Sequence, residues 1–414
     1  MSTRESSHRP GPSSRPIAVP LVILLGTLCG IAPLATDMYL PAFPAMAEDL
    51  QVPASTIQLT LSAFMLGLAT GQLVIGAVSD QVGRRRPLVI GSIICAVSAM
   101  LCALAPTATV LIGARALMGF SGAAGLVLAR SMVADLTEGV QTARYMNVMM
   151  MITGVAPVIA PTLGGVVLSI AAWRAIFWLL ATVTSAMALG VWLLAPESLP
   201  VERRRSGGLR EILTGIRDLL GRPRYRGLLL TFVLSFGTLF SYVSGSTFLM
   251  QNRLGLSETS YALFFGINAA GMLGSTLISA TLVGRFGPQR IAAVGITVSL
   301  LAGTGFLIHA LTGPRVVPTM ILLFTVVSCQ GLVFGNVTSM ALSVGRDRAG
   351  ASSALIGALQ FGMGALVSPL VGIAGDTAVL PMALCLLLCA AGALTTMLVT
   401  TRRIPPARAQ SMRR

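Results

Sequence analysis

Long apolar runs separated by short clusters of charge make up almost the whole chain. Ten runs contain no Asp, Glu or Arg, and each is longer than the ~20 residues that an apolar helix needs to cross a bilayer. Two further apolar stretches are interrupted, Pro16 to Ala47 by Asp37 and residues 109–133 by Arg115 and Arg130. The pattern predicts twelve membrane-spanning helices and therefore an all-α integral membrane protein. The uninterrupted runs cover residues 50–79, 87–114, 145–173, 175–196, 227–252, 259–284, 291–314, 316–345, 349–375 and 377–401.

The composition agrees with this pattern. Of the 414 residues, 54% are apolar and only 10% are charged, and the mean hydropathy is +0.83. A soluble domain carries roughly 25% charged residues. This chain therefore has too few charges to cover a surface that faces water on all sides.

The net charge of +15 is explained by the position of the arginines. All 29 basic residues are Arg. If the N-terminus is cytoplasmic and the spans alternate, 24 Arg lie on the cytoplasmic side, and only Arg174, Arg253 and Arg315 lie outside. This asymmetry is the positive-inside rule. It predicts that both termini are cytoplasmic, and it leaves no excess charge that would indicate a nucleic-acid partner.

The largest polar interruption, Glu197 to Arg226, divides the spans six and six. We expect a cytoplasmic tail (1–16), a first six-helix bundle (17–199), a cytoplasmic linker (200–226), a second six-helix bundle (227–401) and a second tail (402–414). The linker segment LREILTGIRDLL has apolar residues at helical spacing. It can be a short helix on the inner membrane surface or a solvated basic linker, and the sequence leaves both open.

The two halves also resemble each other weakly. AVSDQVGRRR (77–86) and TLVGRFGPQR (281–290) each follow the second span of their half, with Gly83 and Gly287 in register. Such a repeat is typical of transporters built from two pseudo-symmetric bundles with the site between them.

Sequence signals for enzymatic chemistry are missing. The six cysteines have no C-x-x-C spacing, there are two histidines, and neither a phosphate-binding loop nor a G-x-S-x-G elbow occurs. We therefore expect no metal site, no cofactor and no enzymatic activity.

The stretch GAVSDQVGRRRP (76–87) combines an acid at a helix end, a turn glycine and three arginines. Asp80 can meet Arg84, Arg86 or the N-terminus of a helix in the opposite bundle. A basic loop that only sets topology would explain the arginines but not the spacing of the acid and the glycine. We expect a conformational latch formed by Gly76, Asp80, Gly83, Arg84 and Arg86. The stretch resembles the loop motif between the second and third helices of the major facilitator superfamily (MFS).

Further stretches strengthen this resemblance. RALMGFSGAAG (115–125) is similar to the fourth-helix motif, although Met118 stands where the family usually has Gln. GVAPVIAPTLGG (154–165) resembles the fifth-helix motif of drug–proton antiporters, and WRAIF (173–177) follows it. With TDMYLPAFP (36–44) these stretches resemble most closely the Bcr/CflA branch, the bicyclomycin and chloramphenicol resistance type. The residues of the antiporter-motif helix are Gly154, Pro157, Pro161, Gly164 and Gly165.

The resemblance implies a transmembrane transporter of the MFS fold, with twelve helices in two pseudo-symmetric six-helix bundles. It implies proton-coupled multidrug efflux: an antiporter of a bacterial inner membrane that exports small amphipathic compounds and confers antibiotic resistance. The proton is then the coupling ion, a drug and the lipid bilayer are the partners, and a monomer is the functional unit.

Asp37 and Arg115 are the clearest intramembrane charges, and such charges are functional hypotheses by default. We expect them to couple proton and substrate, because the resemblance places a protonatable acid at this position of the first helix. We expect that helix to run from about Pro20 to Phe43, with Pro41 and Pro44 breaking it near its outer end. The alternative is a purely structural ion pair between Asp37 and Arg115.

Several polar residues inside the apolar runs are possible substrate contacts. They can equally form hydrogen bonds between helices, and the sequence does not distinguish the two roles. These residues are Tyr39, Asn268, Gln330, Asn336 and Gln360.

Two other functions remain open at this stage. One is an uptake or facilitative carrier for a metabolite on the same fold, against which the fifth-helix motif argues. The other is a polytopic membrane enzyme, which would need a polar catalytic cluster that the sequence does not show. Sodium coupling is a further alternative, although one intramembrane acid makes a sparse sodium site.

Overall fold

The computed structural model describes residues 18–204, 208–375 and 379–402. Nearly all of both predicted tails lies outside these residues. The described part contains twelve helices that are long and apolar enough to cross a membrane, which confirms the predicted number. The elements of the first half are α1 (Val19–Asp37), η1 (Leu40–Ala42), α2 (Phe43–Asp49), α3 (Ala54–Val82), α4 (Arg85–Ala103), α5 (Ala108–Leu136), α6 (Val140–Ile170), α7 (Arg174–Leu194) and η2 (Val201–Arg203). Those that follow are α8 (Gly208–Gly221), α9 (Pro223–Phe248), η3 (Leu249–Arg253), α10 (Glu258–Phe286), α11 (Pro288–Thr312), α12 (Val316–Val344), η4 (Arg346–Arg348), α13 (Ala349–Val371) and α14 (Leu380–Arg402).

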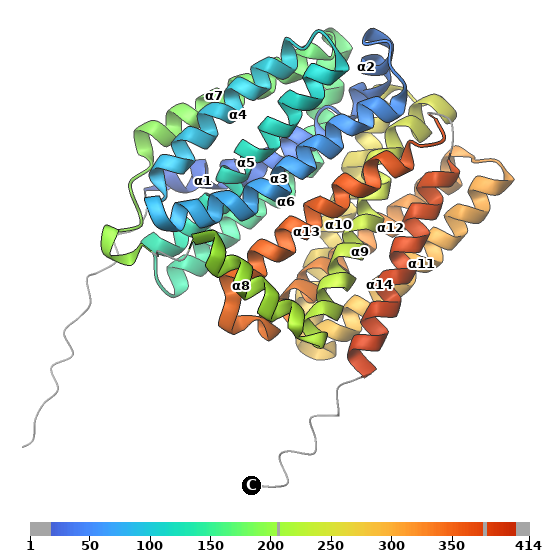
Figure 1. Ribbon diagram of the computed structural model, residues 1–414. Helices are drawn as coiled ribbons and strands as arrows, with labels where there is room; N and C mark the ends of the chain where they lie inside the picture. The colour runs from blue at the N-terminus through green and yellow to red at the C-terminus, as the bar shows by residue number, and fades with distance from the viewer. Residues whose placement is uncertain (1–17, 205–207, 376–378, 403–414) are drawn as a thin grey trace, which may run out of the picture.

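The helices form two bundles, which Figure 1 shows side by side in blue to green and in yellow to red. In the first bundle α5 packs on α1, α3 and α4, and α4 also packs on α7. In the second bundle α12 packs on α10 and α11, and α9 packs on α14. Among the described residues the most extensive contacts between the bundles are those of α3 with α13 and of α6 with α10.

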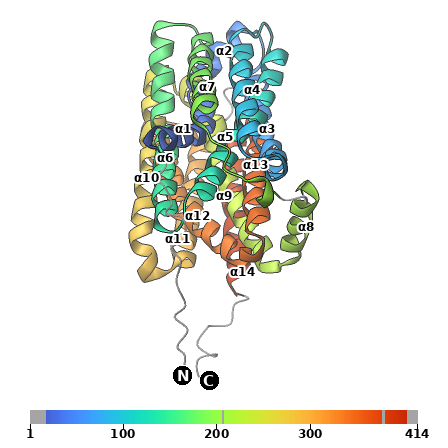
Figure 2. The same cartoon turned by 90° about the vertical axis from the view of Figure 1, so that its left-hand side faces the viewer.

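The two ends of the molecule differ in charge, and we name them accordingly. The arginine-rich end holds α8 and the loops that carry most of the arginines, while α2 and η3 lie at the opposite, arginine-poor end. Figures 1 and 2 both show α2 and α8 toward opposite ends of the molecule.

Of the two alternatives that the sequence leaves open for the linker, the structure shows the helix, α8. It contacts both α3 and α13, so it spans the line where the two bundles meet. Arg222, directly after α8, binds Asp218 at 2.8 Å and Asp347 at 2.6 Å. The carboxylates of Asp347 and Asp218 raise the pKa of Arg222, so this guanidinium stays charged.

Glycine allows very close helix contacts within the first bundle. A Cβ atom at Gly119 of α5 would overlap the carbonyl oxygen of Phe64, and one at Gly67 of α3 would overlap that of Ala116. Small residues let helix backbones touch in a membrane, where no hydrophobic force drives helices together. The α3–α5 contact therefore depends on these two glycines.

The first transmembrane helix ends earlier than we predicted. It stops at Asp37 and not near Phe43, and the short η1 and α2 continue toward the arginine-poor end. Pro41 explains the difference, because its missing N–H is the donor that the Asp37 carbonyl would need for another helical turn. Asp37 is thus the last residue of α1.

Candidate functional site

Asp37 lies where the first bundle meets the second. Its side chain is buried, with 7% of the residue exposed, and its carboxylate forms no ion pair within the described residues. The next residue, Met38, presents its carbonyl oxygen to Gly164 of α6, where a Cβ atom would overlap it. At Gly165 a Cβ atom would lie 3.0 Å from the Cβ of Ala262 in α10. Adjacent glycines of α6 therefore bring the end of α1 close to the second bundle.

Two buried tyrosines, Tyr242 of α9 and Tyr261 of α10, lie near Asp37, and each has a polar partner in the second bundle. Tyr242 and Tyr261 are near enough to interact electrostatically with the Asp37 carboxylate. Asn268 donates from Nδ2 to the Tyr242 hydroxyl at 2.8 Å, and Thr247 donates to the Tyr261 hydroxyl at 2.9 Å. We call Tyr242, Tyr261, Asn268 and Thr247 the tyrosine cluster.

The tyrosine cluster has unused hydrogen-bonding capacity. Within the described part of the chain, the Oδ1 atom of Asn268 is buried without a hydrogen-bond partner. Buried polar groups are usually satisfied. A free acceptor on a residue that binds Tyr242 is what a site that exchanges protons or ligand contacts would need.

Arg115 is fully buried in the first bundle and does not pair with Asp37 in this structure. Its guanidinium lies 4.3 Å from the ring centroid of Tyr39 and 4.2 Å from that of Phe64. Its Nε and Nη2 atoms have no hydrogen-bond partner among the described residues, and Nη1 contacts only the sulfur of Met118, at 3.7 Å. The two rings occupy the faces of the guanidinium, and the structural ion pair with Asp37, which the sequence left open as the alternative, is not formed.

Tyr39, whose ring lies over the Arg115 guanidinium, is itself packed among other buried side chains. Its hydroxyl lies 3.1 Å from Oγ1 of Thr60, and its ring contacts Phe43 and Phe177. Tyr39 is completely buried. In this conformation it supports Arg115 and is not open to a ligand.

Two of the predicted latch residues, Asp80 and Arg84, belong to an ion-pair network at the arginine-rich end. Arg84 binds Asp80 at 2.6 Å and Asp135 at 3.1 Å, so of the three partners that the sequence left open for Asp80 the structure shows Arg84. Arg86 is exposed and has no ion pair among the described residues. Gly83 has φ +99°, and a Cβ atom there would overlap the carboxylate of Glu197.

Glu197 closes this network from the segment after α7. Its carboxylate accepts the backbone N–H groups of Arg84 at 2.8 Å and Leu199 at 3.0 Å. Partial burial raises the pKa of Glu197, but the hydrogen bonds from the amides of Arg84, Leu199 and Arg85 outweigh burial and lower it below its ordinary value. The carboxylate therefore stays ionised and fixes the loop that follows α3.

The proposed antiporter-motif helix, α6, forms the contact with α10. At Gly154 a Cβ atom would lie 3.6 Å from Leu273, and Gly165 faces Ala262. Pro157 and Pro161 lie within the continuous helix α6, between those two contacts. Gly154 and Gly165 therefore lie on the face of α6 that meets the second bundle, while Gly164 packs against the end of α1.

The polar candidates of the second half differ from one another. Gln330 donates to Ser299 at 3.1 Å, and Asn336 donates to Ser279 at 2.7 Å, so both join helices of the second bundle. Asn268 belongs to the tyrosine cluster. Gln360 is half-buried and forms no hydrogen bond within the described residues.

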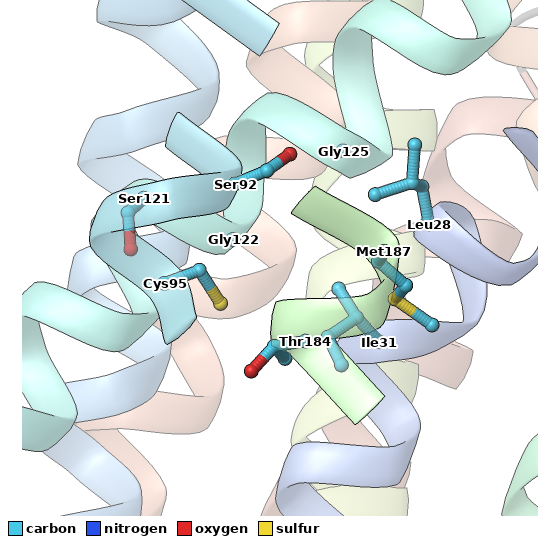
Figure 3. A pocket seen from close by; sticks show the side chains of 9 residues that line it. All are labelled: Leu28, Ile31, Ser92, Cys95, Ser121, Gly122, Gly125, Thr184 and Met187. Carbon is cyan, nitrogen blue, oxygen red and sulfur yellow. The ribbon is translucent and has the colours of Figure 1, made fainter. Parts of the chain in front are cut away.

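The first bundle also contains a small internal cavity of ≈ 10 Å³ between α1, α4, α5 and α7 (Figure 3). It has room for about one water molecule. The hydroxyl of Ser92 lies at its wall, without a hydrogen-bond partner in the part of the chain that the structure describes. The cavity lies inside one bundle and is far too small for a drug.

Comparison with known proteins agrees with this architecture. A model of the Major Facilitator Superfamily matches residues 25–369. The chain belongs to the Major Facilitator Superfamily. It is thus a multi-pass membrane protein and a transporter, and the predicted fold is confirmed.

Individual relatives carry names from drug resistance. The chain is 36% identical to the uncharacterized MFS-type transporter YdgK of Bacillus subtilis, over 87% of this chain and 90% of that protein. It is 28% identical to the bicyclomycin resistance protein homolog of Haemophilus influenzae, over 84% and 88% of the two chains. It is also 28% identical to multidrug resistance protein D of Escherichia coli, over the same shares. The resemblance to the bicyclomycin and chloramphenicol resistance type is thereby confirmed.

Solved structures support the fold alone. A bacterial homolog of the human lysosomal transporter Spinster, in an inward-facing and occupied conformation, matches with a TM-score of 0.73. It is 16% identical, and the match covers 95% of this chain and all of that one.

Sequence reasoning missed several residues around these sites. The sequence could have indicated Asp135 and Glu197 as partners of Arg84, because both lie where a span ends at the same membrane face as that arginine. The sequence could not have indicated Tyr242 and Tyr261, since nothing in their local sequence distinguishes them from packing residues of an MFS helix.

Proposed function

We propose that this protein is a proton-coupled antiporter that exports small amphipathic compounds, including antibiotics, by alternating access. The observation that carries the proposal is Asp37, a buried carboxyl at the junction of the bundles with no ion partner among the described residues. A charged carboxylate in such a place is costly. It is therefore poised to change protonation when its surroundings change.

The orientation follows from the arginines. With the arginine-rich end in the cytoplasm, the protein obeys the positive-inside rule. Asp37 then lies in the outer half of the membrane, near the end that would face the acidic side of a bacterial inner membrane. We propose that it takes up a proton when open to that side and releases the proton when drug binds from the cytoplasm.

The driving force suffices for such a cycle. One proton gains about 2.3 kcal/mol per 100 mV of membrane potential and about 1.36 kcal/mol per unit of pH gradient. At ~100 mV and one pH unit this supports roughly a 500-fold gradient of a neutral drug. One carboxyl can therefore drive useful export.

The names of the relatives support a drug as the substrate. A susceptibility panel tests this: an efflux-deficient bacterial host expresses the wild-type protein or Asp37→Asn at equal membrane levels. We expect the wild type to raise resistance to at least one of bicyclomycin, chloramphenicol and a sulfonamide, and Asp37→Asn to lose that resistance. Unchanged susceptibility to a broad panel, with confirmed membrane expression, would contradict drug export and favour the uptake carrier.

A further inference from the structure

Two glutamines of α3 pack against two glycines where the bundles touch. Gly357 lies within α13, and Gly372 directly follows this helix. Gln58 and Gln72 lie on the same face of α3, about four turns apart. A Cβ atom at Gly372 would overlap the amide oxygen of Gln58, and one at Gly357 would overlap that of Gln72. A larger residue at either glycine would therefore collide with the amide of the facing glutamine.

The Gln58 contact, nearer the arginine-poor end, is held by hydrogen bonds across the bundles. Gln58 Nε2 donates to the backbone carbonyl of Ser244 at 3.1 Å, and the Ser368 hydroxyl donates to the backbone carbonyl of Gln58 at 3.2 Å. The hydroxyls of Ser244 and Ser368 lie 2.8 Å apart. All three residues are at most 1% exposed. Helices α3, α9 and α13 are therefore joined at one buried polar point.

Other cross-bundle contacts lie at the same end. Gln251 donates to the carbonyl of Pro41 at 3.0 Å, and the rings of Phe43 and Phe248 are 5.8 Å apart. The Gln72 contact has the same shape but no hydrogen bond within the described part of the chain. The two contacts thus differ in bonding and not in packing.

We propose that Gln58 is a positioning residue of the transport cycle, which holds the arginine-poor end closed through Gly372, Ser244 and Ser368. Opening that end must break both hydrogen bonds and lift the amide off Gly372. In a dry interface the freed amide loses its partners until water enters, which opposes opening. The contact is a discrete lock between two packed surfaces, as alternation between two states requires.

The lock can be tested without drug or proton gradient, so its failure is distinguishable from failure of the proposed antiport. Spin labels on Thr109→Cys of α5 and Thr312→Cys of α11, both exposed at the arginine-poor end, report the distance between the bundles in nanodiscs. Wild type without introduced cysteines serves as the labelling control. Gln58→Ala removes the Nε2 bond to Ser244 but keeps the backbone carbonyl that Ser368 uses. We therefore expect it to raise the ratio of open to closed populations about 2- to 13-fold, as loss of one hydrogen bond predicts.

Matched variants separate the lock from general packing. Gln72→Ala and Gly357→Ala alter the contact that lacks hydrogen bonds and should shift the ratio less than Gln58→Ala and Gly372→Ala do. Adding Gly372→Ala to Gln58→Ala should have little further effect, because the methyl group then enters the space of the missing amide. Monodispersity and melting temperature confirm folding of every variant. An unchanged distance distribution in both folded Gln58→Ala and folded Gly372→Ala would overturn the proposal, as would equal shifts at the two contacts.

Discussion

At the scale of single residues, the first bundle holds two charges that do not neutralise each other. Asp37 faces the second bundle, and Arg115 is stacked between Tyr39 and Phe64. Aromatic stacking offsets part of the cost of the buried guanidinium, since a desolvated cation–π contact contributes about 2 kcal/mol. Each charge can therefore respond to the cycle independently of the other.

Arg115→Lys tests whether the planar guanidinium matters. Lysine keeps the charge but cannot fill the space between the two rings with a flat group. We expect drug export to fall about tenfold or more and the melting temperature to drop, measured as export from loaded proteoliposomes and by thermal unfolding. Equal export by the lysine variant would show that charge alone is needed.

Tyr242→Phe tests the tyrosine cluster. The change removes a hydroxyl that faces Asp37 and leaves Nδ2 of Asn268 without its acceptor, which costs about 1–3 kcal/mol. We expect export driven by a pH gradient to fall about tenfold, with a changed pH profile.

Tyr225→Phe is the matched control. This tyrosine is also fully buried, and its hydroxyl lies 2.8 Å from Ser352, in a separate apolar cluster of the second bundle. It should lose stability but keep the pH profile. If both tyrosine variants changed export alike, the Tyr242 hydroxyl would have only a structural role.

At the scale of elements, α6 connects the end of α1 to α10. Gly164→Ala would push a methyl group into the carbonyl of Met38, and overpacking of this kind costs about 1–3 kcal/mol. We expect it to displace the residues beside Asp37 and to reduce export strongly. Gly154→Ala, whose methyl group makes an ordinary 3.6 Å contact with Leu273, should export at nearly the wild-type rate. Loss of export in both variants would mean that the motif needs glycine for another reason.

The loop between α3 and α4 depends on an ionised Glu197. Because the pKa of Glu197 is lowered on folding, its contribution is complete above the ordinary value of 4.5 and is lost as the pH falls below it. Glu197→Gln should therefore melt at a lower temperature than wild type at pH 7, and the difference should shrink at pH 4. A difference that is independent of pH would contradict this role.

Local pattern was sufficient to predict the number of spans. It included the linker helix and the pairing of Asp80 with Arg84 only among open alternatives. The predicted end of α1 was wrong by about six residues, because Pro41 has no N–H to donate to the Asp37 carbonyl one turn earlier. The separation of Asp37 from Arg115 could not be predicted, since it depends on which aromatic rings of other helices reach the guanidinium. The glutamine contacts could not be predicted either, because they depend on which residues of α3 and α13 lie opposite each other.

At the scale of the whole molecule, two bundles meet along α3–α13 and α6–α10, with a polar lock near one end and α8 across the other. Asp37 lies at the junction of the bundles, so movement of one bundle against the other changes its surroundings. In the proposed cycle this change alters the protonation of the carboxyl and couples it to drug binding.

Drug export by purified protein in proteoliposomes with an imposed pH gradient tests this account most directly. The drug is the one to which the susceptibility panel shows resistance. Wild type should move the drug against its gradient when the side that the arginine-poor end faces is acidic, and stop when the gradient is collapsed. Asp37→Asn should bind drug and allow downhill exchange but show no transport driven by protons. Full gradient-driven transport by Asp37→Asn would contradict the account, because the proton would then be carried elsewhere.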